Sequence, residues 1–246
     1  MNRRRGRRDP VRPRPRRVWL LDLDNTLHDA SRHAFPRINA AMTAYVAELL
    51  ALPCGEADAL RDHYWHRYGA TLLGLVRHHG VDSAHFLRET HRFDDMAGLV
   101  RRDARLRAAL ARLPGRRIVL TNAPAVYARA VLAALGVAPL FERVVSIESM
   151  RFAGRIQPKP SRAMLRRVVA TLRTDAANCV LLDDTPANLH SARAVGIRTV
   201  LVSGIGRHAA TGPAQRRAGR GRRIDLQVQS VTQLPRGALG SAQKRP

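Results

Sequence analysis

The sequence has few cysteines, little acid and no long apolar run. Its two cysteines, Cys54 and Cys179, cannot make a disulfide framework, which favours a reducing compartment. No apolar window approaches the length of a membrane span. The arginine-rich start is not followed by the apolar stretch of an export signal, because the run at 18–21 leads directly to Asp22. We therefore expect a soluble, cytoplasmic protein without a membrane partner.

The scarcity of acidic residues gives the chain a formal net charge of +24, and most of this charge lies near its ends. Residues 1–17 and 207–246 each carry nine basic residues and one acidic residue, which leaves +8 for the residues between them. Both segments are rich in Arg, Pro and Gly, and we expect basic tails that are disordered at least in part. They could contact nucleic acid non-specifically, or record only an arginine-rich coding bias. Apolar residues at 224–234 predict a last short strand or helix that docks on the core.

Short apolar runs alternate with amphipathic stretches through most of the remaining chain, which is long enough to bury a full core. Strands that alternate with helices, and that are apolar throughout, predict a parallel sheet covered on both faces. We therefore expect an α/β fold with a Rossmann-like sheet. The predicted strands cover residues 18–21, 117–120, 143–147, 179–182 and 199–202, and the predicted helices cover residues 104–113, 125–135, 161–172 and 187–195.

One long section interrupts this alternation. Between residues 30 and 99 the sequence has helical periodicity and no good strand, which predicts a helical cap domain inserted after the first strand. The predicted units are a basic tail at 1–17, a core made of 18–29 and 100–206, a cap at 30–99 and a second basic tail at 207–246.

Polar residues follow the predicted strands at the point where each strand ends. In an open α/β sheet, ligands bind outside the carboxyl ends of the strands, so these residues should meet at one edge. They are Asp22, Asp24 and Thr26 after the first strand, Thr121 and Asn122 after the second, Asp183 and Asp184 after a later one, and Lys159 just before the helix at 161–172.

Four carboxylates at one edge would repel one another unless a cation lay among them. Oxygen ligands suit Mg²⁺, which commonly joins a phosphate to one or two carboxylates. The Thr121 hydroxyl and the Lys159 ammonium group would suit the phosphate. The pattern therefore predicts a metal and phosphoryl site.

Lysine is almost absent from the sequence, since Lys159 and Lys244 are the only lysines among 43 basic residues. An ammonium group is a compact point charge that fits between a carboxylate and a phosphate, whereas a guanidinium group is broad and forked. We interpret Lys159 as a functional residue, with chance retention as the alternative.

Each motif also has a structural interpretation. Asp-x-Asp after a strand is often an Asx-turn or a helix cap, and Asp183–Asp184 could cap a helix that has Pro186 in its first turn. The histidine pairs at 63/66 and 78/79 lack an acid or cysteine that would complete a metal site, so we expect solvated or capping side chains.

The four motifs D-x-D-x-T, T-N, K-P and D-D, taken in this order, resemble the haloacid dehalogenase superfamily of phosphohydrolases over about residues 18–205. The insert corresponds to that superfamily's helical cap of the first type. Within the insert, the stretch 64–80 (YWHRYGATLLGLVRHHG) is similar to the pyrimidine 5′-nucleotidase branch.

The resemblance implies catalytic roles for three residues. Asp22 would be the nucleophile that forms an aspartyl-phosphate, which splits hydrolysis into two steps. Asp24 would protonate the leaving oxygen and then deprotonate the attacking water. Lys159 would offset the charge on the transferring phosphoryl group.

The resemblance also implies a set of binding residues. Mg²⁺ would lie on the Asp22 carboxylate, the Asp24 backbone carbonyl and Asp184, with Asp183 close behind or holding a metal-bound water. Thr121 and Asn122 would orient the phosphoryl oxygens and the nucleophile.

Four residues have two interpretations each. His28 either contacts substrate or packs beneath the cap. Tyr64, Trp65 and Tyr68 lie at helical spacing, and at least two should belong to the cap core, while one could face the cleft and stack on a base.

These observations predict a Mg²⁺-dependent phosphomonoesterase that acts on a nucleoside 5′-monophosphate, with a pyrimidine preferred. A phosphoglycolate or sugar-phosphate phosphatase is the nearest alternative. Dehalogenation is disfavoured because it needs no acid at the position of Asp24. A nucleic-acid-binding protein with an inactive core is an alternative of another class, and the intact motif residues argue against it.

Overall fold

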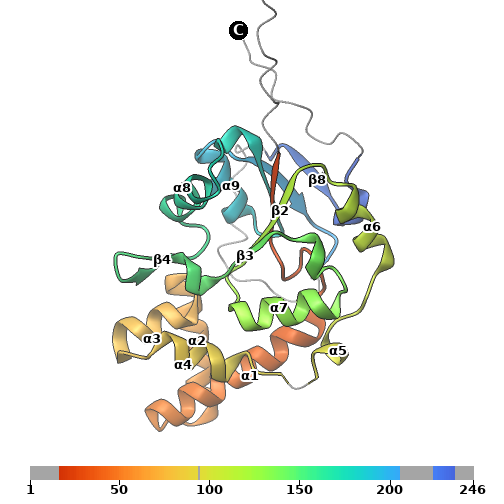
Figure 1. Cartoon of the computed structure of the whole chain (residues 1–246). Coiled ribbons are helices and arrows are strands. Elements are labelled where there is room, and N and C mark those ends of the chain that lie inside the picture. Colours follow the sequence, from red (N-terminus) through yellow and green to blue (C-terminus); the bar gives the residue numbers. More distant parts are fainter. Residues whose placement is uncertain (1–16, 94, 206–223, 236–246) are drawn as a thin grey trace, which may run out of the picture.

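The protein contains one six-stranded parallel sheet, and the computed structural model describes residues 17–93, 95–205 and 224–235 (Figure 1). The strand order is β3-β2-β1-β6-β7-β8, so the first strand lies inside the sheet and has a parallel neighbour on each side. All residues of β1 are buried, which explains their uninterrupted apolar character. The strands are β1 (Val18–Leu21), β2 (Arg116–Leu120), β3 (Arg143–Val145), β6 (Cys179–Asp183), β7 (Arg198–Val202) and β8 (Leu226–Val228).

Helices cover both faces of the sheet. Trp19 and Leu21 of β1 belong to the core cluster with α6 and α7, whereas Val18 and Leu20 belong to the cluster with α8 and α9. This alternation follows from the two-residue period of a strand. The predicted α/β fold class with a Rossmann-like sheet is confirmed. The covering helices are α6 (Ala104–Arg112), α7 (Ala125–Ala134), α8 (Arg162–Thr171) and α9 (Pro186–Ala194).

The stretch between β3 and α8 differs from the sequence prediction. A strand was predicted at 143–147, but β3 ends at Val145 and Ile147 begins a 3-10 turn. Ile147 is buried in a separate hydrophobic cluster with the inserted helices, so its apolar side chain serves a different core from the sheet. A short antiparallel hairpin follows, formed by β4 (Arg151–Phe152) and β5 (Arg155–Ile156). The 3-10 turns among the described residues are η1 (Ala138–Leu140), η2 (Ile147–Met150), η3 (Ala176–Asn178) and η5 (Val231–Gln233).

The inserted segment at 30–99, here called the cap segment, is helical where it is regular (Figure 1). Its helices α2 and α3 approach closely at Gly74, where an added Cβ would lie 2.3 Å from Cγ of Tyr64. Only glycine fits at that contact. The helices of the cap segment are α1 (Ala30–Leu50), α2 (Cys54–Tyr68), α3 (Thr71–His79), α4 (Ser83–Thr90) and α5 (Met96–Leu99).

No single helix in the described ranges is both long enough and apolar enough to cross a membrane. Only α1 and α2 taken together reach the required length and composition, and they meet at a bend of 110°. The two predicted basic tails lie outside the described residues, apart from Arg17 and residues 224–235.

The stretch at 224–235 adds the last strand of the sheet. β8 pairs with β7, and η5 packs against α6. Asp225 fixes this stretch by accepting hydrogen bonds from the backbone N–H and the hydroxyl of Thr199, at 2.8 and 3.0 Å, and from Arg193. Burial would raise the pKa of Asp225, but the bonds from Arg193 and Thr199 outweigh it and lower that pKa.

We expect Asp225→Asn to lower the free energy of unfolding by about 1–3 kcal/mol at neutral pH, because it weakens charge-assisted hydrogen bonds. The pKa of Asp225 is lower in the folded protein than in the unfolded chain, where it is about 4. The stabilisation by the Asp225 carboxylate is therefore fully present above about pH 4 and is lost as the pH falls through the folded-state pKa. Denaturant unfolding at several pH values measures the difference, which should shrink between about pH 5 and pH 3. Gln227→Ala, on an exposed position of β8, is the control and should change stability by less than about 0.5 kcal/mol. A pH-independent difference would contradict the role of the carboxylate.

Candidate active site

The carboxyl end of β1 delivers two aspartates to the edge of the sheet. The Asp22 N–H donates to the carbonyl of Leu182 at 2.9 Å, which extends the pairing with β6 by one step. The chain then turns through Asn25 with a φ of 58°, a conformation that asparagine tolerates better than most residues. The turn brings the Thr26 hydroxyl to within 3.4 Å of Oδ2 of Asp22.

Lys159 lies between carboxylates from two strands. Its Nζ donates to Oδ1 of Asp22 at 2.6 Å and to Oδ2 of Asp183 at 2.8 Å, and the residue is 4% exposed. Burial alone would lower the pKa of the ammonium group, but Asp183 and Asp22 outweigh it and raise that pKa. Lys159 is therefore a protonated, buried cation that joins the ends of β1 and β6.

The side chain of Asn122 holds the backbone of Lys159. Its Oδ1 accepts from the Lys159 N–H at 2.9 Å, and its Nδ2 donates to the Lys159 carbonyl at 3.1 Å. These contacts make Asn122 a support of the loop that carries Lys159, while its expected role toward the phosphoryl oxygens and the nucleophile stays a prediction. The neighbouring Thr121 is buried, and its oxygen accepts from the N–H of Ala123 at 3.0 Å.

The two aspartates after β6 differ in how many donors they meet. Asp183 is fully buried and accepts from Lys159, from the Thr185 N–H and from Nδ2 of Asn188. The bond from Thr185 closes a turn just before α9, whose N-cap is Thr185 and neither of the two aspartates. Asp184 accepts a side-chain hydrogen bond from the Thr185 hydroxyl at 3.2 Å and is hydrogen-bonded to neither Lys159 nor Asn188. Its carboxylate is therefore the one with lone pairs left for a ligand.

The acidic cluster carries more negative charge than Lys159 neutralises. One carboxylate oxygen from each of Asp22, Asp183 and Asp184 lies within 4.8 Å of the others. Burial, reinforced by Asp183, raises the pKa of Asp184 to about 7. Burial also raises the pKa of Asp22 well above its usual value, although Lys159 opposes the shift. A bound divalent cation would relieve this excess charge, so the donor set fits such an ion.

His28 and Asp24 are in contact at the entrance to α1. Nε2 of His28 lies 2.9 Å from Oδ1 of Asp24, and the histidine is buried. The hydroxyl of Tyr127, in α7, donates to the same oxygen at 2.8 Å. Sequence reasoning missed Tyr127 and Asn188, because a lone tyrosine and a lone asparagine on amphipathic helices carry no motif signal.

The aromatic residues of α2 are packed against the histidines of α3. Tyr64 is 7% exposed, and its hydroxyl oxygen is hydrogen-bonded to Nε2 of His79 at 2.7 Å. Its ring stacks on the ring of His78 with 5.4 Å between the ring centroids. The Tyr68 hydroxyl lies 2.6 Å from Nε2 of His78. These contacts favour the packing interpretation for Tyr64, whereas Tyr68 and Trp65 are partly exposed. Within the described ranges, the aspartate cluster is the only three-residue group with metal-ligand geometry.

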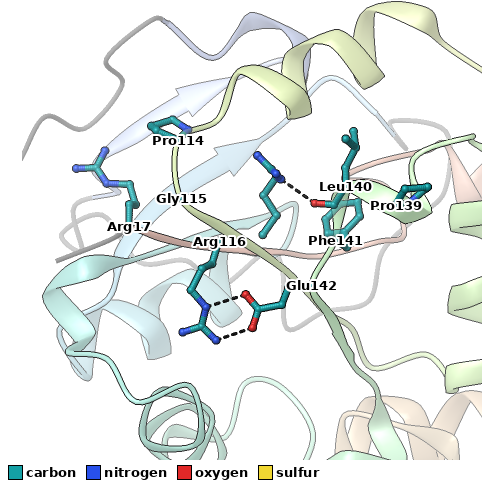
Figure 2. A pocket seen from close by; sticks show the side chains of 9 residues that line it. Arg17, Pro114, Gly115, Arg116, Pro139, Leu140, Phe141 and Glu142 are labelled. Atoms are coloured by element: carbon teal, nitrogen blue, oxygen red, sulfur yellow. Dashed lines mark hydrogen bonds and ion pairs between the residues drawn. The ribbon is translucent and has the colours of Figure 1, made fainter. Parts of the chain in front are cut away.

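A separate cavity of about 580 Å³ opens at the opposite, amino-terminal edge of the sheet (Figure 2). Two arginines of its lining are already bonded. Arg116 makes two bonds of 2.8 Å to Glu142 (Figure 2). Arg117 donates to the carbonyl of Leu140 at 2.7 Å. Because its lining residues lie at or before the starts of β1, β2 and β3, the cavity lies away from the aspartates, which follow the carboxyl ends of β1 and β6.

Aspartates and a lysine thus meet at the carboxyl edge of a parallel α/β sheet, where such folds bind their ligands. Residues 17–196 match the family model described as haloacid dehalogenase-like hydrolase, and the chain belongs to this family. The predicted superfamily is thereby confirmed.

Two curated relatives are similar over most of the chain. Phosphate metabolism protein 8 of Saccharomyces cerevisiae is 24% identical over 199 residues, which are 76% of this chain and 61% of the relative. The chain thus spans less than two thirds of that protein's length. Phosphoglycolate phosphatase of Rhodospirillum rubrum is 30% identical over 201 residues, which are 75% of this chain and 78% of the relative.

Solved structures share the fold at low sequence identity. A HAD phosphatase from Thermococcus onnurineus superposes with a TM-score of 0.59 at 16% identity, covering 92% of this chain and 98% of the other. L-2-haloacid dehalogenase from Xanthobacter autotrophicus has a TM-score of 0.56 at 17% identity, with 92% and 99% coverage. At these identities the similarity concerns the fold alone.

We expect Lys159→Met to lower the free energy of unfolding by about 3–5 kcal/mol in EDTA, because two buried carboxylates lose their partner. Mg²⁺ should recover part of this loss if a divalent cation binds the same carboxylates. Urea unfolding in EDTA and in Mg²⁺, followed by circular dichroism, measures both quantities. Arg116→Met is the control: it removes the partly exposed pair with Glu142, should cost about 1 kcal/mol, and should show no Mg²⁺-dependent recovery. A Lys159→Met loss that Mg²⁺ leaves unchanged would contradict the cation site.

Proposed function

We propose that this hydrolase is a Mg²⁺-dependent phosphomonoesterase that works through an aspartyl-phosphate on Asp22. The observation that carries the proposal is the Asp22 carboxylate, which belongs to the acidic cluster and accepts from the Lys159 ammonium group at 2.6 Å, with Asp24 two residues further on. This arrangement provides a nucleophile, a fixed positive charge and a second acid at one edge of the sheet.

In the first step, a carboxylate oxygen of Asp22 forms a bond to phosphorus while the bond from phosphorus to the ester oxygen breaks. Asp24 gives its proton to that departing oxygen. In the second step, Asp24 takes a proton from water, whose oxygen bonds to phosphorus while the Asp22–phosphate bond breaks. Free phosphate, the Asp22 carboxylate and the protonated Asp24 result, which is the starting state. Lys159 and the Thr121 hydroxyl would hold the charge on the phosphoryl oxygens.

Asp22, Asp184 and the backbone carbonyl of Asp24 would hold Mg²⁺, with Asp183 behind them. When bound, the ion would neutralise the charge that builds up on the phosphoryl group. Asp183 would then act mainly through Lys159 and Asn188, since its oxygens already accept bonds from both.

For the substrate we propose a nucleoside 5′-monophosphate, with a pyrimidine preferred. Support comes from the similarity of residues 64–80 to the pyrimidine 5′-nucleotidase branch and from the partial exposure of Trp65 and Tyr68. The relative named phosphoglycolate phosphatase favours phosphoglycolate or a sugar phosphate as the second candidate. A phosphate-release screen over nucleotides and small phosphate esters, with and without Mg²⁺, discriminates between them. The cytoplasmic location and the contact of the basic tails with nucleic acid stay predictions.

We expect Asp22→Asn to reduce phosphatase activity by several orders of magnitude, because an amide cannot form the covalent intermediate. The fold should persist, as circular dichroism can verify. Asp175→Asn, at an exposed position that precedes the amino-terminal end of β6, is the matched control and should keep full activity. Activity of Asp22→Asn close to that of the parent would refute the mechanism.

The cap segment yields a prediction about the substrate. If the base stacks on Trp65 or Tyr68, removing the contributing ring should cost about 1–3 kcal/mol with UMP or CMP. The loss should be absent with p-nitrophenyl phosphate at saturation, because Asp22 is untouched. Kinetics of Trp65→Ala and Tyr68→Ala on both kinds of substrate measure this difference. Equal losses on both would mean that the rings only pack the cap segment, and better turnover of phosphoglycolate without any ring effect would exclude the nucleotidase.

A further inference from the structure

The two oxygens of the Asp24 carboxylate have different surroundings. Oδ1 is 2.8 Å from the hydroxyl of Tyr127 and 2.9 Å from Nε2 of His28. Oδ2 meets no hydrogen-bond donor among the described residues, and 15% of the Asp24 side chain is exposed. The protein therefore binds one oxygen of this acid twice and leaves the other open.

Both donors are fixed in the interior and come from different parts of the chain. Tyr127 is completely buried in α7, and its ring meets His91 at 5.8 Å and Phe93 at 6.1 Å in edge-to-face geometry. Burial and the nearby Asp24 carboxylate raise the pKa of Tyr127, so its hydroxyl stays protonated and can donate. His28 is buried at the turn that leads into α1. Two rigid donors on one oxygen define the plane of the carboxylate.

The arrangement suits an acid that must carry a proton in one half of a cycle and lack it in the other. A carboxylate accepts hydrogen bonds at both oxygens, and a carboxylic acid protonated on Oδ2 still accepts at Oδ1. Tyr127 and His28 thus keep their bonds in both states, and no hydrogen bond has to be rearranged when the proton moves.

We propose that Tyr127 and His28 are positioning residues that hold Oδ1 of Asp24, so that Oδ2 is the oxygen that exchanges the proton with the leaving group and with water. This inference rests on the proposed function, in which Asp24 is the general acid and base. Neither donor is placed on the substrate; each acts through Asp24.

The test compares two substrates of similar shape whose leaving groups need acid catalysis to different extents. Phenol is a weaker acid than p-nitrophenol, so its departing oxygen depends more on the proton that Asp24 supplies. The value of kcat/KM reports the steps up to formation of the phosphoenzyme. It should be measured for the full chain with Mg²⁺ on phenyl phosphate and on p-nitrophenyl phosphate.

We expect Asp24→Asn to lose at least about 100-fold on phenyl phosphate and much less on p-nitrophenyl phosphate. Tyr127→Phe keeps the ring packing and removes only the donor, and it should lose about 10-fold on phenyl phosphate, with a smaller loss on the nitro compound. His28→Gln retains an N–H donor and should stay within a few-fold of the parent, whereas His28→Leu should behave like Tyr127→Phe. Tyr45→Phe is the control, because its hydroxyl bonds to the exposed His85.

The double variant Asp24→Asn with Tyr127→Phe should be no slower than Asp24→Asn alone, because a positioning residue has no effect without its target. Equal losses of Asp24→Asn on the two substrates would refute the acid role in the proposed function. A leaving-group-dependent loss for Asp24→Asn, combined with equal losses or none for Tyr127→Phe, would overturn the positioning inference alone. The same pattern in Tyr45→Phe as in Tyr127→Phe would also overturn it.

Discussion

The ion pairs of Lys159 with Asp22 and Asp183 connect the loops at the carboxyl edge of the sheet. These loops follow β1 and β6, which are neighbours in the sheet, so their acidic side chains are brought together by strand order. Without a cation between them, two buried carboxylates at this distance would not both be ionised. Asn122, after β2, holds the backbone that carries the ammonium group, so a third strand end also depends on this contact.

The four acids at this edge differ mainly in how many of their lone pairs the protein already occupies. Asp183 is saturated by Lys159, Thr185 and Asn188, which suits a structural anion. Asp24 is bound at one oxygen only, and Asp184 accepts a single hydroxyl bond. Neighbouring aspartates thus acquire distinct chemistry from their surroundings: burial and the nearby Asp183 raise the pKa of Asp184 to about 7.

Much of this edge could be predicted from the sequence, because a parallel sheet places all its carboxyl ends together. Apolar runs that end in polar motifs indicated the strands and placed Asp22 at this edge, and the start of the helix after residue 160 indicated Lys159. The helical period between residues 30 and 99 likewise indicated the inserted helices. The strand predicted at 143–147 was too long, since hydrophobicity does not tell which of two cores an apolar residue such as Ile147 enters.

Sequence reasoning failed where a contact joins positions far apart without a motif. Tyr127 reaches Asp24 across 103 residues, and its apolar neighbours on α7 are those of any core helix. Asn122 was recognised, but its hydrogen bonds to the backbone of Lys159 were not predicted, because an amide can orient a ligand or a backbone equally well. Such choices depend on distances that only the folded chain defines.

The near-absence of lysine has a practical consequence for handling the protein. Reagents that acylate amines need an accessible, unprotonated nitrogen, and Lys159 is 4% exposed and held as an ammonium ion by two carboxylates. Lys244 is the only other lysine in the sequence. Amine-directed dyes or resins should therefore spare the site, whereas reagents directed at guanidinium groups would modify many positions at once.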